Sequence, residues 1–205
     1  SGATTAYSYS GQIGRQRWKT RATVNSVNYS GVYAYTYKYN HRNELKEAQY
    51  ATSVTGAPYQ LNYGNVYREH GLAYDLNGNL TGLSRNDAAG TLRESLSYNY
   101  IPNKNQLSNL TGTFNNAGGY LKVQGSGNYT YNGNGQLTDD VAENVRQEYD
   151  VYGRVVKVYE RSSNLLKVEF VYNANGMRIR KIGYGTAGNA TYTYYAYAGS
   201  RLMSI

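Results

Sequence analysis

Few residues in this chain have the types and spacing that catalysis requires. Glu69 and His70 are the best candidates for acid–base chemistry, because a carboxylate and an imidazole can exchange protons with a substrate. If their segment is a strand, however, alternation sends the two neighbouring side chains to opposite faces. His41, the second histidine, is expected to lie exposed in a turn. We therefore expect no enzyme, and full activity after mutation of Glu69 and His70 would dispose of a hydrolase.

Metal and thiol chemistry have little support. Asp139, Asp140 and Glu143 could form a carboxylate pair, but we expect them in a solvated loop. The chain has no Cys, which excludes zinc–thiolate sites, disulfides and thiol nucleophiles. We predict no catalytic residue, no metal site and no cofactor.

Asp75, Asn77 and Asn79 imitate the start of a calcium-binding loop. The glycine of this segment comes one place too early, and its twelfth position is Asn86 where a calcium loop needs Glu. A turn is the better interpretation, because Asn and Asp side chains accept hydrogen bonds from backbone amides inside turns.

The same segment belongs to a unit that recurs along the chain. Each copy has Tyr, then Asp or Asn, then a turn with Gly or Asn, and then an aliphatic residue that restarts a strand, which is Val155 in the fourth copy and Ile179 in the fifth. The repeat positions are Tyr39, Asn40 and Leu45; Tyr74, Asp75, Gly78 and Leu80; Tyr131, Asn132, Gly135 and Leu137; Tyr149, Asp150, Gly153 and Arg154; and Tyr172, Asn173, Gly176 and Arg178. A degenerate sixth copy contains Tyr100. Successive tyrosines lie 35, 26, 31, 18 and 23 residues apart, so the period is irregular.

Each unit predicts a β-hairpin. Gly supplies the positive φ that a tight turn requires, and Asn can replace it. Asn-Gly pairs are strong signals for short hairpins. We predict turns near residues 40–44, 75–79, 101–106, 132–136, 150–154 and 173–177, with tyrosines of the segment 33–39 on one face of a strand.

Composition agrees with an all-β chain. The 205 residues include 26 Tyr and 23 Gly but only 2 Pro, and Tyr favours pleated, half-buried surfaces. The only helical element that we allow is a turn near Glu44 to Tyr50, and we expect a looser loop from Gly112 to Gly127. No apolar run approaches the roughly 18 residues of a membrane span. The first residues show no initiator Met and no signal-peptide pattern, so we expect a fragment of a longer chain.

The formal net charge of +8 raises the question of nucleic acid. Its cations are mostly scattered singly, and the densest groups are residues 15–19 and 178–181. Alternation would put Arg178 and Arg180 on one face of a strand and Ile179 on the other. Solvated strand faces or protection of a sheet edge are the favoured interpretation, and nucleic acid is not expected as a partner.

The Tyr-Asp-x-x-Gly units closely resemble the YD repeats of the RHS family, which includes bacterial toxin shells and animal teneurins. The resemblance runs from about Tyr7 to Leu202. It implies an array of antiparallel hairpins in a curved or spiralling sheet, with residues 1–205 forming a single array that is an arc of an RHS-type shell. Neither Pro58 nor Pro102 follows Asp, so the Asp-Pro core that follows such repeats in the family is missing.

The resemblance implies a non-catalytic wall of a secreted or cell-surface bacterial protein that encloses or presents a cargo such as a C-terminal toxin. Its expected partners are the remaining segments of the same polypeptide, the cargo or the secretion machinery. A cell-surface adhesin whose tyrosines stack on glycans is the alternative. Covered tyrosines would favour the wall, and exposed aromatic patches would favour adhesion.

Overall fold

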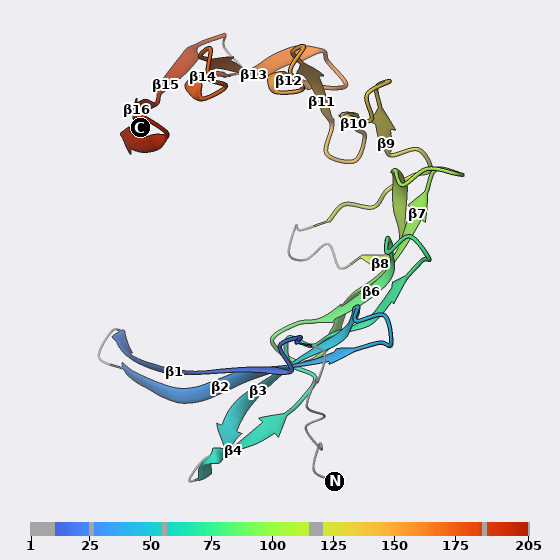
Figure 1. The fold of residues 1–205 in the computed structure, drawn as a ribbon, viewed down its shortest axis with the longest axis vertical. Helices are drawn as coiled ribbons and strands as arrows, with labels where there is room; N and C mark the ends of the chain where they lie inside the picture. Colours follow the sequence, from blue (N-terminus) through green and yellow to red (C-terminus); the bar gives the residue numbers. More distant parts are fainter. Residues whose placement is uncertain (1–10, 25–26, 55–56, 115–120, 186–187, 205) are drawn as a thin grey trace. The chain divides into compact units, whose positions relative to one another are not determined.

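Every regular element in the described part of the chain is a β-strand. The computed structural model describes residues 11–24, 27–54, 57–114, 121–185 and 188–204. Within these ranges there is no helix, and therefore no helix that could cross a membrane. All pairings between strands are antiparallel (Figure 1). The prediction of an all-β chain built from antiparallel hairpins is confirmed.

The chain forms two compact units. The first comprises residues 1–105 and 110–121, and the second comprises residues 106–109 and 122–205. Each unit is an array of hairpins. The expectation of one array over residues 1–205 stays a prediction.

The first unit contains a sheet with the order β1-β2-β3-β5-β6-β7-β8, in which β4 pairs with β3; the first three residues of β8 fall in the second unit. Strands that follow one another in the chain are mostly neighbours in this sheet, as in a meander. Its strands are β1 (Arg15–Val24), β2 (Val27–Tyr39), β3 (Leu45–Val54), β4 (Ala57–Tyr63), β5 (Glu69–Tyr74), β6 (Leu80–Asn86), β7 (Leu92–Tyr100) and β8 (Leu107–Phe114).

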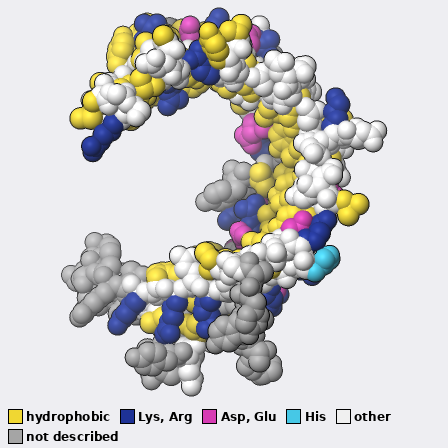
Figure 2. Space-filling model, in the orientation of Figure 1, with side chains coloured by type: hydrophobic (Ala, Val, Ile, Leu, Met, Phe, Trp, Pro, Cys, Tyr) yellow, Lys and Arg dark blue, Asp and Glu magenta, His cyan; other side chains and the backbone are white. Residues whose placement is uncertain are grey.

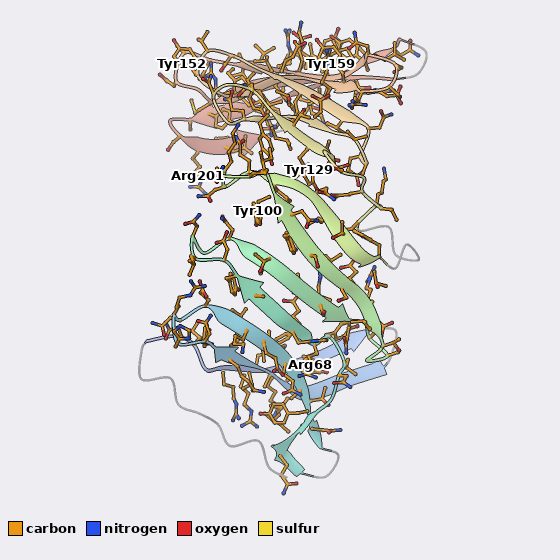
Figure 3. The ribbon with its side chains drawn as sticks, turned by 90° about the vertical axis from the view of Figure 1, so that its right-hand side faces the viewer. Arg68, Tyr100, Tyr129, Tyr152, Tyr159 and Arg201 are labelled. Carbon is orange, nitrogen blue, oxygen red and sulfur yellow. The ribbon has the colours of Figure 1, made fainter. Side chains whose placement is uncertain are left out.

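β3 has two partners on one edge, where the sheet of the first unit forks. Residues 51–54 of β3 pair with β4, while Ala48 pairs with Glu69 of β5. The β3–β4 hairpin therefore leaves the sheet, as Figures 1 and 3 show. Glu47 holds the fork through ion pairs with Lys38 and Arg68, both at 3.1 Å.

The second unit contains a seven-stranded sheet with the order β15-β14-β13-β12-β11-β10-β9 and a two-stranded sheet of β16 and β17. The order in the larger sheet follows the chain without a crossover. Its strands are β9 (Tyr129–Tyr131), β10 (Leu137–Asp140), β11 (Val145–Tyr149), β12 (Val155–Glu160), β13 (Leu165–Tyr172), β14 (Arg178–Tyr184) and β15 (Ala190–Tyr194), followed by β16 (Ala196–Ala198) and β17 (Arg201–Ser204).

Little apolar surface is fully buried in either unit. Among the described residues, the buried apolar side chains are Ala34, Ala48, Ala51, Leu96, Leu110 and Ile182. Most strand residues are only half-buried, because among the described strands of each unit no second layer covers the main sheet. Typical domains bury a core between two layers. Here the backbone ladders and polar side-chain contacts must carry a larger share of the stability.

Two local expectations from the sequence are corrected. In the segment from Glu44 to Tyr50, for which the sequence allows a helical turn, residues 45–50 form the start of β3 instead. Pairing with β2 along its whole length overrides the helix propensity of its Leu, Lys, Glu and Ala residues. The loop expected from Gly112 to Gly127 begins inside β8, which runs to Phe114, and residues 115–120 lie outside the described residues.

Candidate functional site

The most developed feature of the chain is its repeated turn. The side-chain oxygen of Asp75 accepts hydrogen bonds from the backbone amides of Asn77, at 2.8 Å, and Asn79, at 2.9 Å. The same pair of bonds, to the second and fourth following amides, is made by Asn40, Asp87, Asn132, Asp150 and Asn173. The Asp75 side-chain oxygen therefore already accepts hydrogen bonds from backbone amides. A turn accounts for the contacts of this oxygen in residues 75–79 better than a calcium loop does.

The backbone of each turn closes on itself. In the copy at Asp150, the Asp150 amide donates to the Arg154 carbonyl at 2.9 Å, and the Gly153 amide donates to the Asp150 carbonyl at 3.0 Å. The fourth turn residue then has a positive φ: 83° at Gly78, 80° at Gly153 and 63° at Asn43. Gly adopts this conformation without a steric cost, and Asn is the residue that replaces it most readily.

The repeat tyrosine ties its hairpin to the preceding one. The Tyr74 hydroxyl donates to the backbone carbonyl of Leu45 at 2.9 Å, and the Tyr149 hydroxyl donates to that of Leu137 at 2.7 Å. Equivalent bonds join Tyr39 to Ile13, Tyr100 to Leu80, Tyr131 to Leu107, Tyr172 to Val155 and Tyr197 to Arg178. In six of these seven bonds the acceptor belongs to the first residue of a strand, and Ile13 lies two residues before β1. The bonds of Tyr131 and Tyr197 join strands of different sheets, whereas in the other copies the side-chain bond accompanies pairing within one sheet.

The tyrosine is placed by a constant register. Five repeat tyrosines, at positions 39, 74, 131, 149 and 172, face the residue six positions later across their own turns, whereas Tyr197 faces Leu202, five positions later. In five copies the pairing shifts by one residue immediately before the tyrosine. Such a bulge bends a strand and redirects a side chain. The bulge accompanies the hydrogen bond from the tyrosine to the neighbouring hairpin.

Burial keeps these hydroxyls protonated. Desolvation raises the pKa of Tyr131 and Tyr149, and the pKa of Tyr74 is raised by desolvation and by the charge of Glu44. The turn carboxylates behave in the opposite way. Hydrogen bonds from the Asn79 side chain and from backbone amides hold the pKa of Asp75 below its usual range. Each group is thus held in the protonation state that its hydrogen bonds require.

Arg154 adds a second contact between neighbouring hairpins. Partial desolvation opposes ionisation of Asp150, but hydrogen bonds from Arg154 and from backbone amides lower its pKa. The guanidinium lies 2.7 Å from the Asp150 carboxylate and 4.7 Å above the ring of Tyr172, in the next copy of the repeat. It also lies 4.9 Å from the ring of Tyr152, which is 80 % exposed at the turn margin of the unit (Figure 3).

The cations of residues 178–181 differ from the expectation. The Arg178 guanidinium lies between the rings of Phe170, at 5.1 Å, and Tyr195, at 4.7 Å. The neighbouring residue Ile179, by contrast, is exposed, at 36 %. The predicted solvated face is therefore wrong for Arg178, because aromatic rings cover it. On the face drawn in Figure 2, Lys and Arg side chains are spread along the strands of each unit, and those of Arg15, Arg17 and Lys19 on the edge strand β1 are exposed.

An aromatic cluster lies on β1, β2 and β3. Trp18 packs against Tyr33 and Tyr35 with ring centroids 6.0 Å apart, and Tyr50 contacts Tyr35 at 5.4 Å. Tyr37 continues the row on β2, as alternation predicts. Tyr67 meets the edge of Tyr50 at 5.8 Å, and its φ of 48° is unusual for a bulky residue. Trp18 is 37 % and Tyr67 49 % exposed, so this cluster is partly open to solvent.

The acid–base candidates do not assemble into a reactive site. His70 contacts the Asn86 side chain at 3.2 Å, and His41 is exposed in its turn. Asp139 and Asp140 lie in β10 and not in the expected loop, and Asp139 pairs with Arg161 at 3.2 Å. Among the described residues, no group of three His, Asp or Glu side chains gathers as a metal site would need.

Two features of the described chain were not predicted from the sequence. The turn at Asp87 has the same hydrogen bonds as the repeats but no tyrosine before it, although Asp87-x-x-Gly90 could have revealed it. Tyr197 makes the bond between hairpins without an Asp or Asn after it. The degenerate copy keeps this bond at Tyr100, and Asn103 supplies its positive φ of 61°.

No protein-family model matches this chain, and no curated protein is similar enough in sequence to count as a relative.

Proposed function

We propose that the chain is a non-catalytic structural wall of an exported YD-repeat protein of the RHS type, which encloses or presents a cargo such as a C-terminal toxin. On this proposal its partners are the remaining segments of its own polypeptide and that cargo or the secretion machinery. Its location is outside the cell or on a bacterial surface.

The bond from each repeat tyrosine to the preceding hairpin is the observation that carries this proposal. Among the described residues seven tyrosines make it, and six of them begin a unit that the sequence predicts. A tyrosine used in this way links successive hairpins, and its hydroxyl is already engaged by a backbone carbonyl. Arrays of this kind gain stability from contacts between neighbouring repeats.

The thin core supports the same proposal. A sheet with one layer and few buried side chains is a poor scaffold for a rigid active site, which needs residues locked by surrounding packing. It suits a wall, whose two faces meet different surroundings. Tyr also suits such a face, because its ring packs on neighbours while its hydroxyl finds a polar partner.

The test is to produce the complete polypeptide that contains this chain and to image it by electron cryomicroscopy, with limited proteolysis alongside. The expected result is a hollow particle in which a C-terminal segment resists protease until the particle is opened with denaturant. A complete polypeptide that forms no enclosure, and in which protease digests every segment beyond the repeats at once, would overturn the proposal.

The second candidate is a cell-surface adhesin that binds glycans, and the aromatic cluster favours it. Partly exposed, packed rings such as Trp18 and Tyr67 can stack on the apolar faces of sugars. A glycan array with the purified chain tests this alternative. Binding that is lost in Trp18→Ala and kept in Tyr152→Ala would support adhesion, whereas absence of binding would leave the wall as the better account.

A further inference from the structure

The outer edge of β15 has the properties of a strand-pairing surface. β15 ends the strand order of its sheet, and among the described strands it pairs with β14 alone (Figure 1). Its sequence, Ala-Thr-Tyr-Thr-Tyr, contains no charge and no Pro. Tyr192 is 53 % and Tyr194 61 % exposed. Regular, uncharged edge strands are templates for the addition of another strand.

The other sheet edges are less suited to pairing. β1 carries exposed cations at Arg15, Arg17 and Lys19, which protect an edge against other strands. β8 is interrupted by Gly112, whose φ is 122°. β9 and β16 have only three residues each, β17 carries Arg201, and the first side chains of β4 lie outside the described residues. β15 is therefore the most regular uncharged edge of the described sheets.

We propose that β15 pairs with the same strand of a second copy of this chain, antiparallel and about a two-fold axis at Tyr192. In this register Tyr192 faces the partner's Tyr192, Thr191 faces the partner's Thr193, and Ala190 faces the partner's Tyr194. The sequence is thus its own complement: a large side chain lies opposite a small one at both ends. Thr–Thr and aromatic pairs directly across antiparallel strands are stabilising.

The existing ring contact fits this arrangement. Tyr192 and Tyr194 lie on one face with centroids 6.4 Å apart and planes 16° from parallel. The two-fold axis joins this pair to its symmetry mate, so that four phenol rings form one row. Among the described strands, β16 pairs with β17 and not with β15. The outer edge of β15, five residues long, is therefore available to the second copy.

The association is expected to be weak and reversible. A stable interface buries about 800 Å² on each partner, which is more than one five-residue edge provides. The net charge of +8 on each copy opposes association, and salt screens this repulsion. The inference concerns the 205-residue chain and does not rest on the proposed function. A strand supplied by a longer polypeptide would compete for the same edge.

Sedimentation of the 205-residue chain over about a hundredfold range of concentration tests the inference. The wild type should show a monomer–dimer equilibrium that tightens with added salt. Thr193→Lys should weaken it at least about tenfold, because it puts a charge on the pairing edge. Thr91→Lys, in the exposed turn at residues 87–91, makes the same change in net charge and should leave it unchanged.

A double variant tests the register. Thr191→Glu combined with Thr193→Lys restores the wild-type net charge and sets two Glu–Lys pairs across the two-fold axis. It should regain the association that Thr193→Lys loses. A wild type that is monomeric throughout, equal effects of Thr91→Lys and Thr193→Lys, or a double variant as weak as Thr193→Lys would each overturn the inference. Circular dichroism of every variant checks that the strands still form.

Discussion

The hydroxyl of Tyr172 donates a hydrogen bond of 2.9 Å to the backbone carbonyl of Val155, and this bond joins two hairpins that are consecutive in the chain. Tyr172 ends β13, whereas Val155 begins β12, one turn earlier. The same relationship recurs in both units. It offers a direct way to measure what the repeats contribute to stability.

Tyr172→Phe should destabilise the second unit by about 1 kcal/mol, because it removes one net hydrogen bond and leaves the ring in place. Hydrogen exchange of the β13 amides with increasing urea measures the local free energy of opening. Tyr152→Phe is the matched control, since its ring is 80 % exposed. Equal losses in the two variants would show that the bond to Val155 carries no stability.

Gly112→Ala should be far more damaging than Gly78→Ala. Both glycines have a positive φ, but a Cβ at Gly112 would lie 2.0 Å from the backbone carbonyl oxygen of Ser95, whereas a Cβ at Gly78 has nothing within 4 Å. Gly78→Ala should therefore cost only the conformational strain of about 1–2 kcal/mol. Gly112→Ala should also separate β8 from its neighbour. Thermal unfolding and exchange of the β8 amides distinguish the two costs.

Asn132→Ala should destabilise its turn by about 1–2 kcal/mol, because two backbone amides lose their acceptor. Asn132→Asp should be nearly neutral, since Asp75 and Asp150 make the same bonds in their own turns. Urea unfolding of the two variants beside the wild type provides the measurement. A large loss in Asn132→Asp would mean that the Asn132 amide nitrogen, which donates to the Gln136 side chain at 2.7 Å, matters more than the turn.

The fork of the first unit should weaken in acid. Glu47 is partly desolvated, which opposes its ionisation, but hydrogen bonds from Arg68 and Lys38 lower its pKa. Because the folded-state pKa lies below the unfolded one, the stabilisation is present above the unfolded pKa and is lost as pH falls through the folded pKa.

Urea unfolding as a function of pH should therefore show a difference between wild type and Glu47→Gln of at most about 1 kcal/mol near neutral pH. The difference should shrink toward low pH. A difference that stays constant across this range would contradict an ionic role for Glu47. Lys46→Gln, at a position with no ion pair among those described, serves as the charge control.

The turns could be predicted from the sequence because every interaction that defines them lies within five residues. Asp150 and Gly153 act on backbone groups of their own turn, so the local pattern is sufficient. The bond from Tyr172 to Val155 could not be predicted in this way. It spans 17 residues, and the corresponding span from Tyr74 to Leu45 is 29 residues. No fixed spacing exists for a reader of the sequence to find.

Sequence patterns also failed where neighbouring strands decide the outcome. Glu44 to Tyr50 contains good helix formers, but pairing with β2 makes this segment a strand. Arg178 alternates as a solvated residue would, yet Phe170 and Tyr195 from other parts of the chain enclose it. Propensity and periodicity describe one segment at a time, whereas these outcomes depend on which segments become neighbours.

The acceptor in each of these bonds is a main-chain carbonyl, which every amino acid carries. Leu45, Val155 and Arg178 serve equally well, so mutation at the accepting position leaves the link intact. The length of chain between two linked positions can also vary. In the first unit the β3–β4 hairpin lies between Leu45 and Tyr74, and the hydrogen bond between these two residues still forms. Such an array can diverge in sequence, accept grafted loops and grow by duplication while its connections persist.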